Sequence, residues 1–357
     1  MIAYFIPFII LSILTLLESS KKFFFLVKNQ YLYTLIAIFF IIFIGLRYEI
    51  GCDWAQYQEM FEKYNNTNII EIIERNLFEK QKLQELGHIF ITKISHNIYI
   101  LNLIYSILFS LPLFYFCSKL KKRYFSILIS YPYYIVVIGM GPIRQAACIS
   151  LLMISILLVA KKKYYMSFFL TIFSLLIHQF SILFNGLILG SLFTKFKNIK
   201  LSRKMIFLIV VISLILLYSL PSMINKVYLY FTLFKKIDQN GTIIIPPAKS
   251  AIYIWFINFI PSIIFLKNIP KFKFQNSLNK ILTLFSISEF LLLPIVFLNS
   301  VVAYRLLLYL FPSSILITSK LPELNLFKLK SKYLLNIIIL CCFISLIVWL
   351  NFAYHAS

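Results

Sequence analysis

The chain has 357 residues, of which 61% are hydrophobic and only 13% are charged, and its mean hydropathy is +0.88. A water-soluble domain carries about 25% charged residues, so this composition excludes a soluble protein. The apolar runs are continuous and do not alternate, which excludes a membrane β-barrel and predicts an all-α, polytopic integral membrane protein. The formal net charge of +23 does not indicate a nucleic-acid partner, because the Lys and Arg residues lie in short clusters between apolar runs, as topology determinants do.

Twelve apolar segments are predicted to be transmembrane helices, since a span needs about 20 residues and at least about 17. They lie at residues 2–18, 31–47, 98–117, 124–140, 143–160, 164–179, 179–194, 205–221, 251–266, 280–298, 300–319 and 333–353. The first resembles a signal peptide but has no basic segment before it, so we interpret it as a retained helix. We expect a single transmembrane domain over residues 1–357.

The basic residues are concentrated on one side of the predicted helices. Alternate connections hold 23 of the 35 Lys and Arg residues, and only Glu18 and Glu323 of the 12 acidic residues lie on that side. These connections are residues 21–28, 119–123, 161–163, 195–204, 267–280 and 320–332. The positive-inside rule places them in the cytoplasm and both termini outside.

Two predicted outer loops are long. Residues 47–97 contain eight of the 12 acidic residues and have amphipathic stretches, for which we expect short interfacial helices. Residues 221–250 contain aromatic residues and the turn signals Asn240-Gly241 and Pro246-Pro247, and we interpret them as a partly ordered outer lid.

The first outer loop begins with polar residues at helix ends. Arg47 ends the second predicted helix, and Asp53 follows a turn at Gly51. Asp53 and Tyr57 are four residues apart, on one face of a predicted short helix. Asp53 is either the N-cap of that helix or a carboxylate base, and the spacing does not choose between them.

A second polar site is expected where Pro142 opens the helix over 143–160. The outward N-terminus of this helix offers free N–H groups, to which Arg144 and Gln145 add side-chain donors. Together they predict a phosphate or pyrophosphate site. The alternative is an Arg144 that reaches the membrane interface or pairs with a structural acid.

Two later residues are ionisable groups in apolar helices. His178 lies at the outer end of its helix, either as a packing residue or as a base. Arg305 lies more than one turn inside an apolar run, with Tyr309 four residues later on the same face. Either Glu289 of the preceding helix neutralises Arg305, or Arg305 faces the outer cavity as a second phosphate ligand.

The ordered set of these elements resembles the EpsG family of Wzy-type polysaccharide polymerases. Residues 46–61 are similar to the family pattern F/L-R-Y-x-x-G-x-D-Y/W-x-x-Y-x-x-x-F. Later family elements are matched by Glu85-Leu86-Gly87 (E-x-G), Ile143-Arg144-Gln145 (I-R-Q), His178 with Ser181, and Arg305 with Tyr309. Leu86 is a departure, because the family often has Pro there.

The resemblance implies a glycosyltransferase that polymerises polyprenyl-pyrophosphate-linked oligosaccharide repeat units on the outer face of the bacterial cytoplasmic membrane. The growing O-antigen, capsule or exopolysaccharide chain moves from its lipid carrier to a new unit, and the pyrophosphate lipid leaves. The implied partners are this lipid-linked donor and acceptor, the lipid bilayer and a chain-length regulator.

The resemblance also gives roles to the polar residues. Substrate or pyrophosphate binding is expected of Arg47, Tyr57, Arg144, Gln145, Arg305 and Tyr309. The candidate proton acceptors are Asp53, Glu85 and His178, with Glu289 lying deeper. No sequence motif for metal, nucleotide or Ser-triad chemistry occurs, so we expect no metal and no other cofactor.

Two other functions remain open at the level of sequence. A lipid-linked oligosaccharide flippase would place its site near the bilayer midplane between internal repeats, whereas the charges here crowd the outer boundary. An O-antigen ligase would use a similar donor but transfer the glycan to lipid A.

Overall fold

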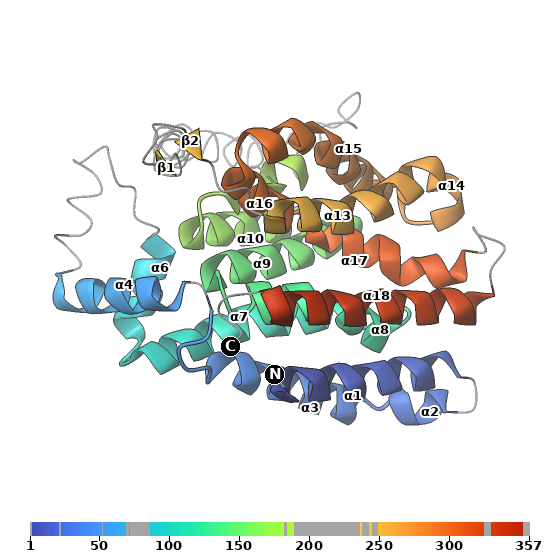
Figure 1. The fold of residues 1–357 in the computed structure, drawn as a ribbon, viewed down its shortest axis with the longest axis horizontal. Coiled ribbons are helices and arrows are strands. Elements are labelled where there is room, and N and C mark those ends of the chain that lie inside the picture. Colours follow the sequence, from blue (N-terminus) through green and yellow to red (C-terminus); the bar gives the residue numbers. More distant parts are fainter. Residues whose placement is uncertain are drawn as a thin grey trace.

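The computed structural model describes residues 2–20, 23–51, 53–68, 71, 86–181, 184–188, 236–237, 243–244, 249–324 and 330–352. The described residues are almost entirely helical (Figure 1). Strands β1 (Lys236–Ile237) and β2 (Ile243–Ile244) pair antiparallel, with Lys236 opposite Ile244.

The helices follow the apolar segments of the sequence. Their bounds are α1 Ile2–Ser19, α2 Phe24–Val27, α3 Gln30–Gly45, α4 Trp54–Asn66, α6 Leu86–Ile94, α7 Ile98–Ser118, α8 Arg123–Ser130, the π-helix η1 Tyr131–Ile138, α9 Ile143–Ala160, α10 Tyr164–Ile177, α13 Lys249–Lys267, α14 Ile269–Phe272, α15 Asn276–Leu298, α16 Ser300–Leu308, α17 Phe311–Lys320, the 3₁₀ helix η3 Leu321–Glu323 and α18 Ser331–Phe352.

The predicted count of twelve membrane spans is not confirmed. Among the described residues, α1, α7, α9, α15 and α18 are long and apolar enough to cross a membrane, which gives five spans, or up to six with a bent pair. Shorter apolar helices lie at four more predicted segments: Gln30–Gly45, Arg123–Ile138, Tyr164–Ile177 and Ala251–Lys267. The predicted segments 179–194 and 205–221 lie partly or wholly outside the described residues.

The bent pair corrects the prediction of one helix over 300–319. Here α16 and α17 meet at 54°. Pro312, in the first turn of α17, has no backbone N–H to donate to the carbonyl of Leu308, so a continuous α-helix would lose that bond. The bend places Tyr309 at the end of α16.

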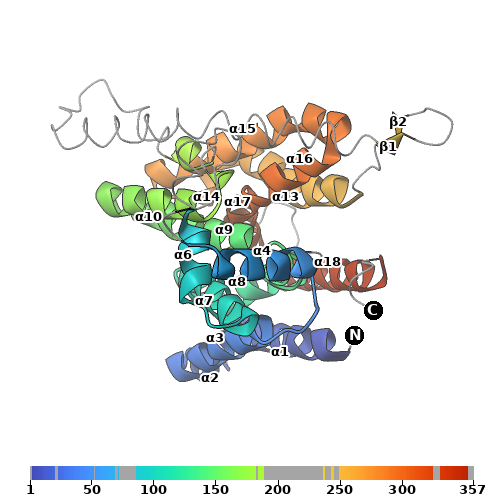
Figure 2. The same cartoon turned by 90° about the vertical axis from the view of Figure 1, so that its left-hand side faces the viewer.

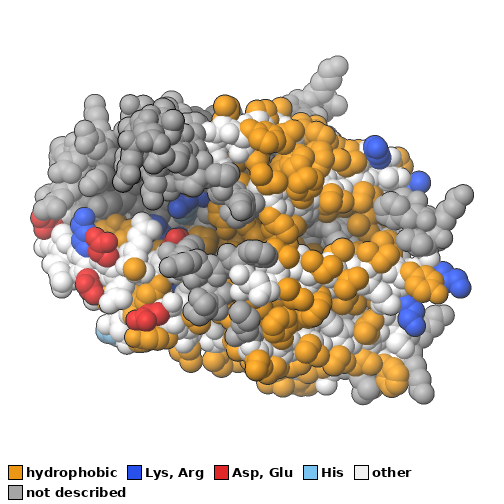
Figure 3. Space-filling model, viewed as in Figure 1, with side chains coloured by type: hydrophobic (Ala, Val, Ile, Leu, Met, Phe, Trp, Pro, Cys, Tyr) orange, Lys and Arg blue, Asp and Glu red, His pale blue; other side chains and the backbone are white. Residues whose placement is uncertain are grey.

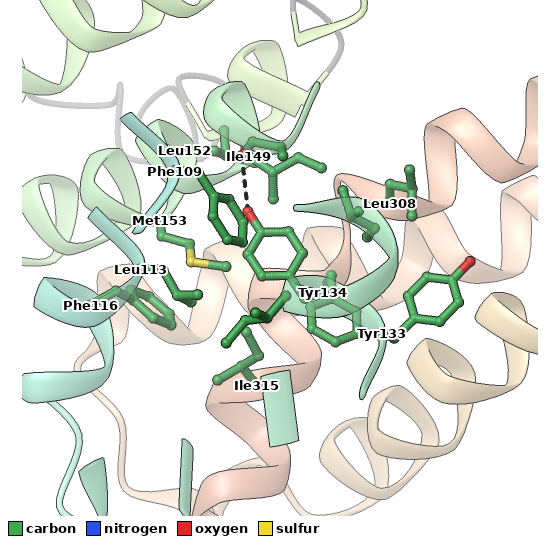
Figure 4. Close-up of a cluster of buried hydrophobic side chains, with 14 of the residues drawn as sticks. Phe109, Leu113, Phe116, Tyr133, Tyr134, Ile149, Leu152, Met153, Leu308 and Ile315 are labelled. Carbon is green, nitrogen blue, oxygen red and sulfur yellow. Dashed lines mark hydrogen bonds between the residues drawn. The ribbon is translucent and has the colours of Figure 1, made fainter. Parts of the chain in front are cut away.

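Helix α9 lies in the middle of the bundle. It packs between α7 and α10, and 72% of its 18 residues are buried, against 22% for an 18-residue stretch of α18. Aromatic side chains of the preceding helices pack against it. The ring of Tyr134 in η1 lies beside Phe109 and Met153 (Figure 4), and its hydroxyl is hydrogen-bonded to Ser150 Oγ, 3.0 Å away. Helix α9 is therefore surrounded by packed helices on several sides.

The two ends of the bundle differ in charge. In the face shown in Figure 3, acidic side chains gather, with some Lys and Arg, at the end where α4 lies. The charged side chains visible at the opposite end are Lys and Arg, and apolar side chains lie between the two ends. The start of α1 and the end of α18 lie toward the end of the bundle where α4 lies (Figure 1). This arrangement agrees with the side on which the sequence placed the acidic loop.

One acidic residue on the basic side has a structural role. Glu18, at the end of α1, is buried, and its carboxylate accepts hydrogen bonds from Arg123 N, Tyr124 N and Phe125 N at 2.7, 3.2 and 3.2 Å. An anion at the first N–H groups of α8 is favoured by the helix dipole. Glu18 therefore fixes the start of α8 against α1.

Of the two long outer loops, the structure describes mainly the first. Helices α4 and α6 lie within residues 47–97, as short helices outside the spanning set, and Figure 2 shows them in front of the ends of the bundle helices. Most of the amphipathic stretch over 69–86 and most of the predicted lid over 221–250 lie outside the described residues.

Candidate functional site

Two side chains at the start of α9 contact two different helices. Pro142 occupies the N-cap position, one residue before the helix, rather than the first helical turn. The half-buried Arg144 places its guanidinium carbon 5.3 Å from the ring centroid of Tyr57 in α4. The buried Gln145 donates from Nε2 to the backbone oxygen of Arg305 in α16, at 2.6 Å. The structure thus brings four of the predicted site residues together around one helix end.

A glycine allows the first outer loop to lie against the turn before α9. Gly51 has φ +109°, a conformation that L side chains rarely adopt. A Cβ at this position would also clash with the Met140 carbonyl. The loop that carries Arg47 and Asp53 therefore packs directly on the backbone that leads to Arg144.

The Arg47 side chain donates hydrogen bonds to two backbone oxygens and to one side chain of the protein. It is 4% exposed, and it donates from Nε to Ile50 O at 3.1 Å and from Nη1 to Ile44 O at 3.1 Å. Its Nη2 donates to Asn102 Oδ1 of α7 at 3.2 Å. These donors fix the loop to the end of α3, and the role of Arg47 as a phosphate ligand stays a prediction.

Asp53 occupies the N-cap position of α4, but its side chain makes no capping hydrogen bond. The structure therefore gives no support to the interpretation of Asp53 as a helix cap. Tyr57, one turn later, is buried, which raises the pKa of its phenol; the Arg144 guanidinium opposes this shift and Asp53 adds to it. Asp53, Tyr57 and Arg144 thus share one electrostatic environment.

The E-x-G element of the sequence lies beside the end of α10. Glu85 itself lies outside the described residues. A Cβ on Gly87, in α6, would come within 2.8 Å of Leu176 O. The glycine therefore permits close packing of α6 on the turn that precedes His178.

His178 and Tyr309 form a buried pair. His178 follows the last residue of α10 and is 5% exposed, and its Nδ1 lies 2.9 Å from the hydroxyl of Tyr309. The Tyr309 ring stacks on Phe184 at 5.1 Å between centroids. Since Tyr309 lies one turn beyond Arg305, this pair joins α10 to the helix that Gln145 contacts.

Glu289 is not the partner of Arg305. Its side chain is fully buried in α15, and neither carboxylate oxygen has a hydrogen-bond partner in the part of the chain that the structure describes. Its backbone oxygen accepts a hydrogen bond from Trp255 Nε1 at 3.2 Å. The structure thus contradicts the alternative in which Glu289 neutralises Arg305.

Sequence reasoning missed two polar residues of this region. His88, next to Gly87, is 1% exposed and contacts Tyr57, and Asn102 holds Arg47. For Asn102 the available signal was a lone amide in an apolar helix. For His88 it was the position directly after the E-x-G element.

An anion site at this place stays a prediction. The half-buried residues Arg144 and Arg305 belong to two helices joined through Gln145, and an anion near the N-terminus of α9 would also be favoured by the helix dipole. Aspartate, histidine and tyrosine side chains lie on the elements around them.

A family comparison agrees with this ordered set of residues. No curated protein and no solved structure matches the chain. The EpsG family model matches residues 30–357, which contain every candidate site residue. The chain therefore belongs to the EpsG family, which is a family of Wzy-type polymerase-like proteins.

Proposed function

We propose that the protein is a membrane glycosyltransferase that polymerises polyprenyl-pyrophosphate-linked oligosaccharide repeat units. The observation that carries the proposal is the convergence of Arg144, Gln145, Tyr57 and Arg305 at the start of α9, in a member of the EpsG family. Arginine is well suited to a pyrophosphate because its planar fork binds phosphate oxygens in pairs.

In the proposed reaction, a hydroxyl of the acceptor unit attacks the anomeric carbon of the donor glycan. The new glycosidic bond forms as the bond from that carbon to the pyrophosphate oxygen breaks. Arg144 and Arg305 stabilise the negative charge that develops on the departing polyprenyl pyrophosphate. A base takes the acceptor proton, and Asp53, which influences Tyr57 electrostatically as Arg144 does, is the leading candidate.

We place the protein in the bacterial cytoplasmic membrane, with the α4 end outside. The charge separation in Figure 3 supports this orientation. The proposed site then faces the side where flipped lipid-linked units accumulate. A chain-length regulator and the bilayer are the further partners that this assignment implies.

The orientation predicts which cysteines an impermeant reagent reaches. In a variant without the native cysteines, Gln58→Cys, on the exposed face of α4, is expected to label in intact cells. Lys161→Cys, at the end of α9, is expected to label only after permeabilisation. Labelling of Lys161→Cys in intact cells would contradict the orientation and the outer site together.

A deletion strain tests the function itself. Loss of a polymerase leaves surface glycan with one repeat unit, and plasmid-borne wild-type protein should restore long chains. Loss of a flippase leaves no surface glycan, and loss of a ligase leaves polymer on the lipid carrier. Either of the last two outcomes would replace the proposed function.

A further inference from the structure

His88 lies in a buried cluster of tyrosines that includes Tyr57 of the proposed site. It belongs to α6 and is 1% exposed, and its Nδ1 lies 2.8 Å from the hydroxyl of Tyr105 in α7. The centroids of the Tyr57, Tyr64 and Tyr105 rings lie 6.1, 6.0 and 5.7 Å from that of His88. A buried imidazole with a tyrosine hydroxyl partner is fixed in orientation, because breaking the bond would leave a polar group unsatisfied.

Tyr57 connects this cluster to Arg144. Its ring packs edge-on against His88, at 70° between planes, and also lies 5.3 Å from the Arg144 guanidinium carbon. Four elements are therefore linked in series: α9 through Arg144, α4 through Tyr57, α6 through His88 and α7 through Tyr105. Of these, α7 and α9 are spanning helices that pack on each other, whereas α4 and α6 are short.

This series of side-chain contacts fixes the position of the short helices α4 and α6 relative to the spanning helices α7 and α9. The guanidinium of Arg144 lies at the end of a long, flexible side chain, and an aromatic ring beside it limits the directions that it samples. The position of the Tyr57 ring depends in turn on the imidazole against which it packs. A group placed in advance loses less freedom when its ligand binds.

We propose that His88 and Tyr105 form a positioning pair, which holds the Tyr57 ring beside Arg144 and so directs Arg144 toward the pyrophosphate of the lipid-linked donor. This inference rests on the proposed function. Neither His88 nor Tyr105 touches the substrate in this scheme; both act through Tyr57.

The test measures binding of polyprenyl pyrophosphate without sugar to the purified protein, and separately the donor KM and kcat of polymerisation. His88→Phe keeps a ring in place but removes the bond to Tyr105, and Tyr105→Phe removes only the hydroxyl. Each is expected to weaken probe binding and kcat/KM about tenfold or more, the range expected when a buried partner is lost. The double variant should be no weaker than either single variant, because both remove the same interaction.

Two further variants separate positioning from general damage. His88→Asn carries a polar atom near the position of Nδ1 and should recover most of the loss. Tyr115→Phe, an exposed tyrosine on the same helix α7, should bind the probe as the wild type does. If His88→Phe does not fold, Tyr105→Phe and His88→Asn decide the question by the same binding measurement.

The outcomes distinguish this inference from the function on which it rests. Additive losses in the double variant, or wild-type probe binding in Tyr105→Phe, would overturn the positioning pair while leaving the polymerase intact. A wild-type protein that binds the probe but does not polymerise would overturn the proposed function. The probe affinities of the variants relative to the wild type would then still test whether His88 and Tyr105 act as a pair. A wild-type protein that does not bind the probe would overturn both.

Discussion

Arg144→Ala is expected to reduce polymerisation of lipid-linked units by about 100-fold or more, with normal protein levels. Removing one pre-placed donor from a developing oxyanion costs about 10²–10³ in rate in other enzymes, and here the departing group is a pyrophosphate. Arg144→Lys should also be impaired, because lysine keeps the charge but not the paired geometry. Single-turnover rates on purified donor and acceptor units are the measurement.

Arg305→Ala tests the second arginine of the proposed site without removing the contact between α9 and α16. Gln145 donates to the backbone oxygen of Arg305, so the alanine variant keeps the link between α9 and α16 and removes only the guanidinium. We expect a loss comparable to that of Arg144→Ala. Lys63→Ala, which removes an exposed positive charge from α4, should polymerise at the wild-type rate. Long-chain glycan at wild-type level in either arginine variant would remove that arginine from the site.

The sequence was sufficient to predict that these residues share one end of the bundle. Charge separation assigns the face, and the helix breaks at Pro142 and after Ile177 assign the ends, so Arg144 and His178 were expected near the outer boundary. Their convergence also depends on Gly51 and Gly87, whose positions in the sequence are visible but whose contacts with Met140 and Leu176 are not.

The errors arose where the rotation of one helix against another decides the contact. The sequence places Glu289 and Arg305 on consecutive helices, yet the carboxylate and the guanidinium are not paired. Likewise, the sequence does not show that Asn102 of α7 faces Arg47, or that His88 faces Tyr57. Helical periodicity gives a face within one helix, and packing of neighbours fixes which faces meet.

Among the described residues, helix length supports five or six spans and does not confirm the predicted twelve. An apolar run indicates burial in lipid or in protein, but it does not report breaks within the run. Pro312 divides one predicted span into α16 and α17. Another begins as α8 and continues as the π-helix η1, which starts at Tyr131 and has Pro132 in its first turn. Both irregular segments lie next to site elements, since Tyr309 follows α16 and η1 leads to the turn before α9.

The second large effect is expected for Asp53→Asn, which should lower the polymerisation rate about 10²–10⁴-fold while binding of polyprenyl pyrophosphate stays near the wild-type level. The amide is isosteric but is not a base. Stability should change little, because the Asp53 side chain makes no capping hydrogen bond that the variant would lose. The parallel measurement of binding and turnover matters, since a residue that only orients Arg144 would weaken both.

Competing bases are separated by the same two measurements. His178 is engaged with Tyr309 in a buried pair, so His178→Gln and Tyr309→Phe are expected to act alike and to alter binding as well as turnover. Glu59→Gln, an exposed acid on α4, should be silent and controls for loss of negative charge near the loop. If Asp53→Asn polymerises at close to the wild-type rate, Asp53 is not the base, and Glu85→Gln becomes the next variant to test. If instead only turnover falls, the proton of the acceptor hydroxyl passes to Asp53, one turn of α4 away from the tyrosine that lies beside Arg144.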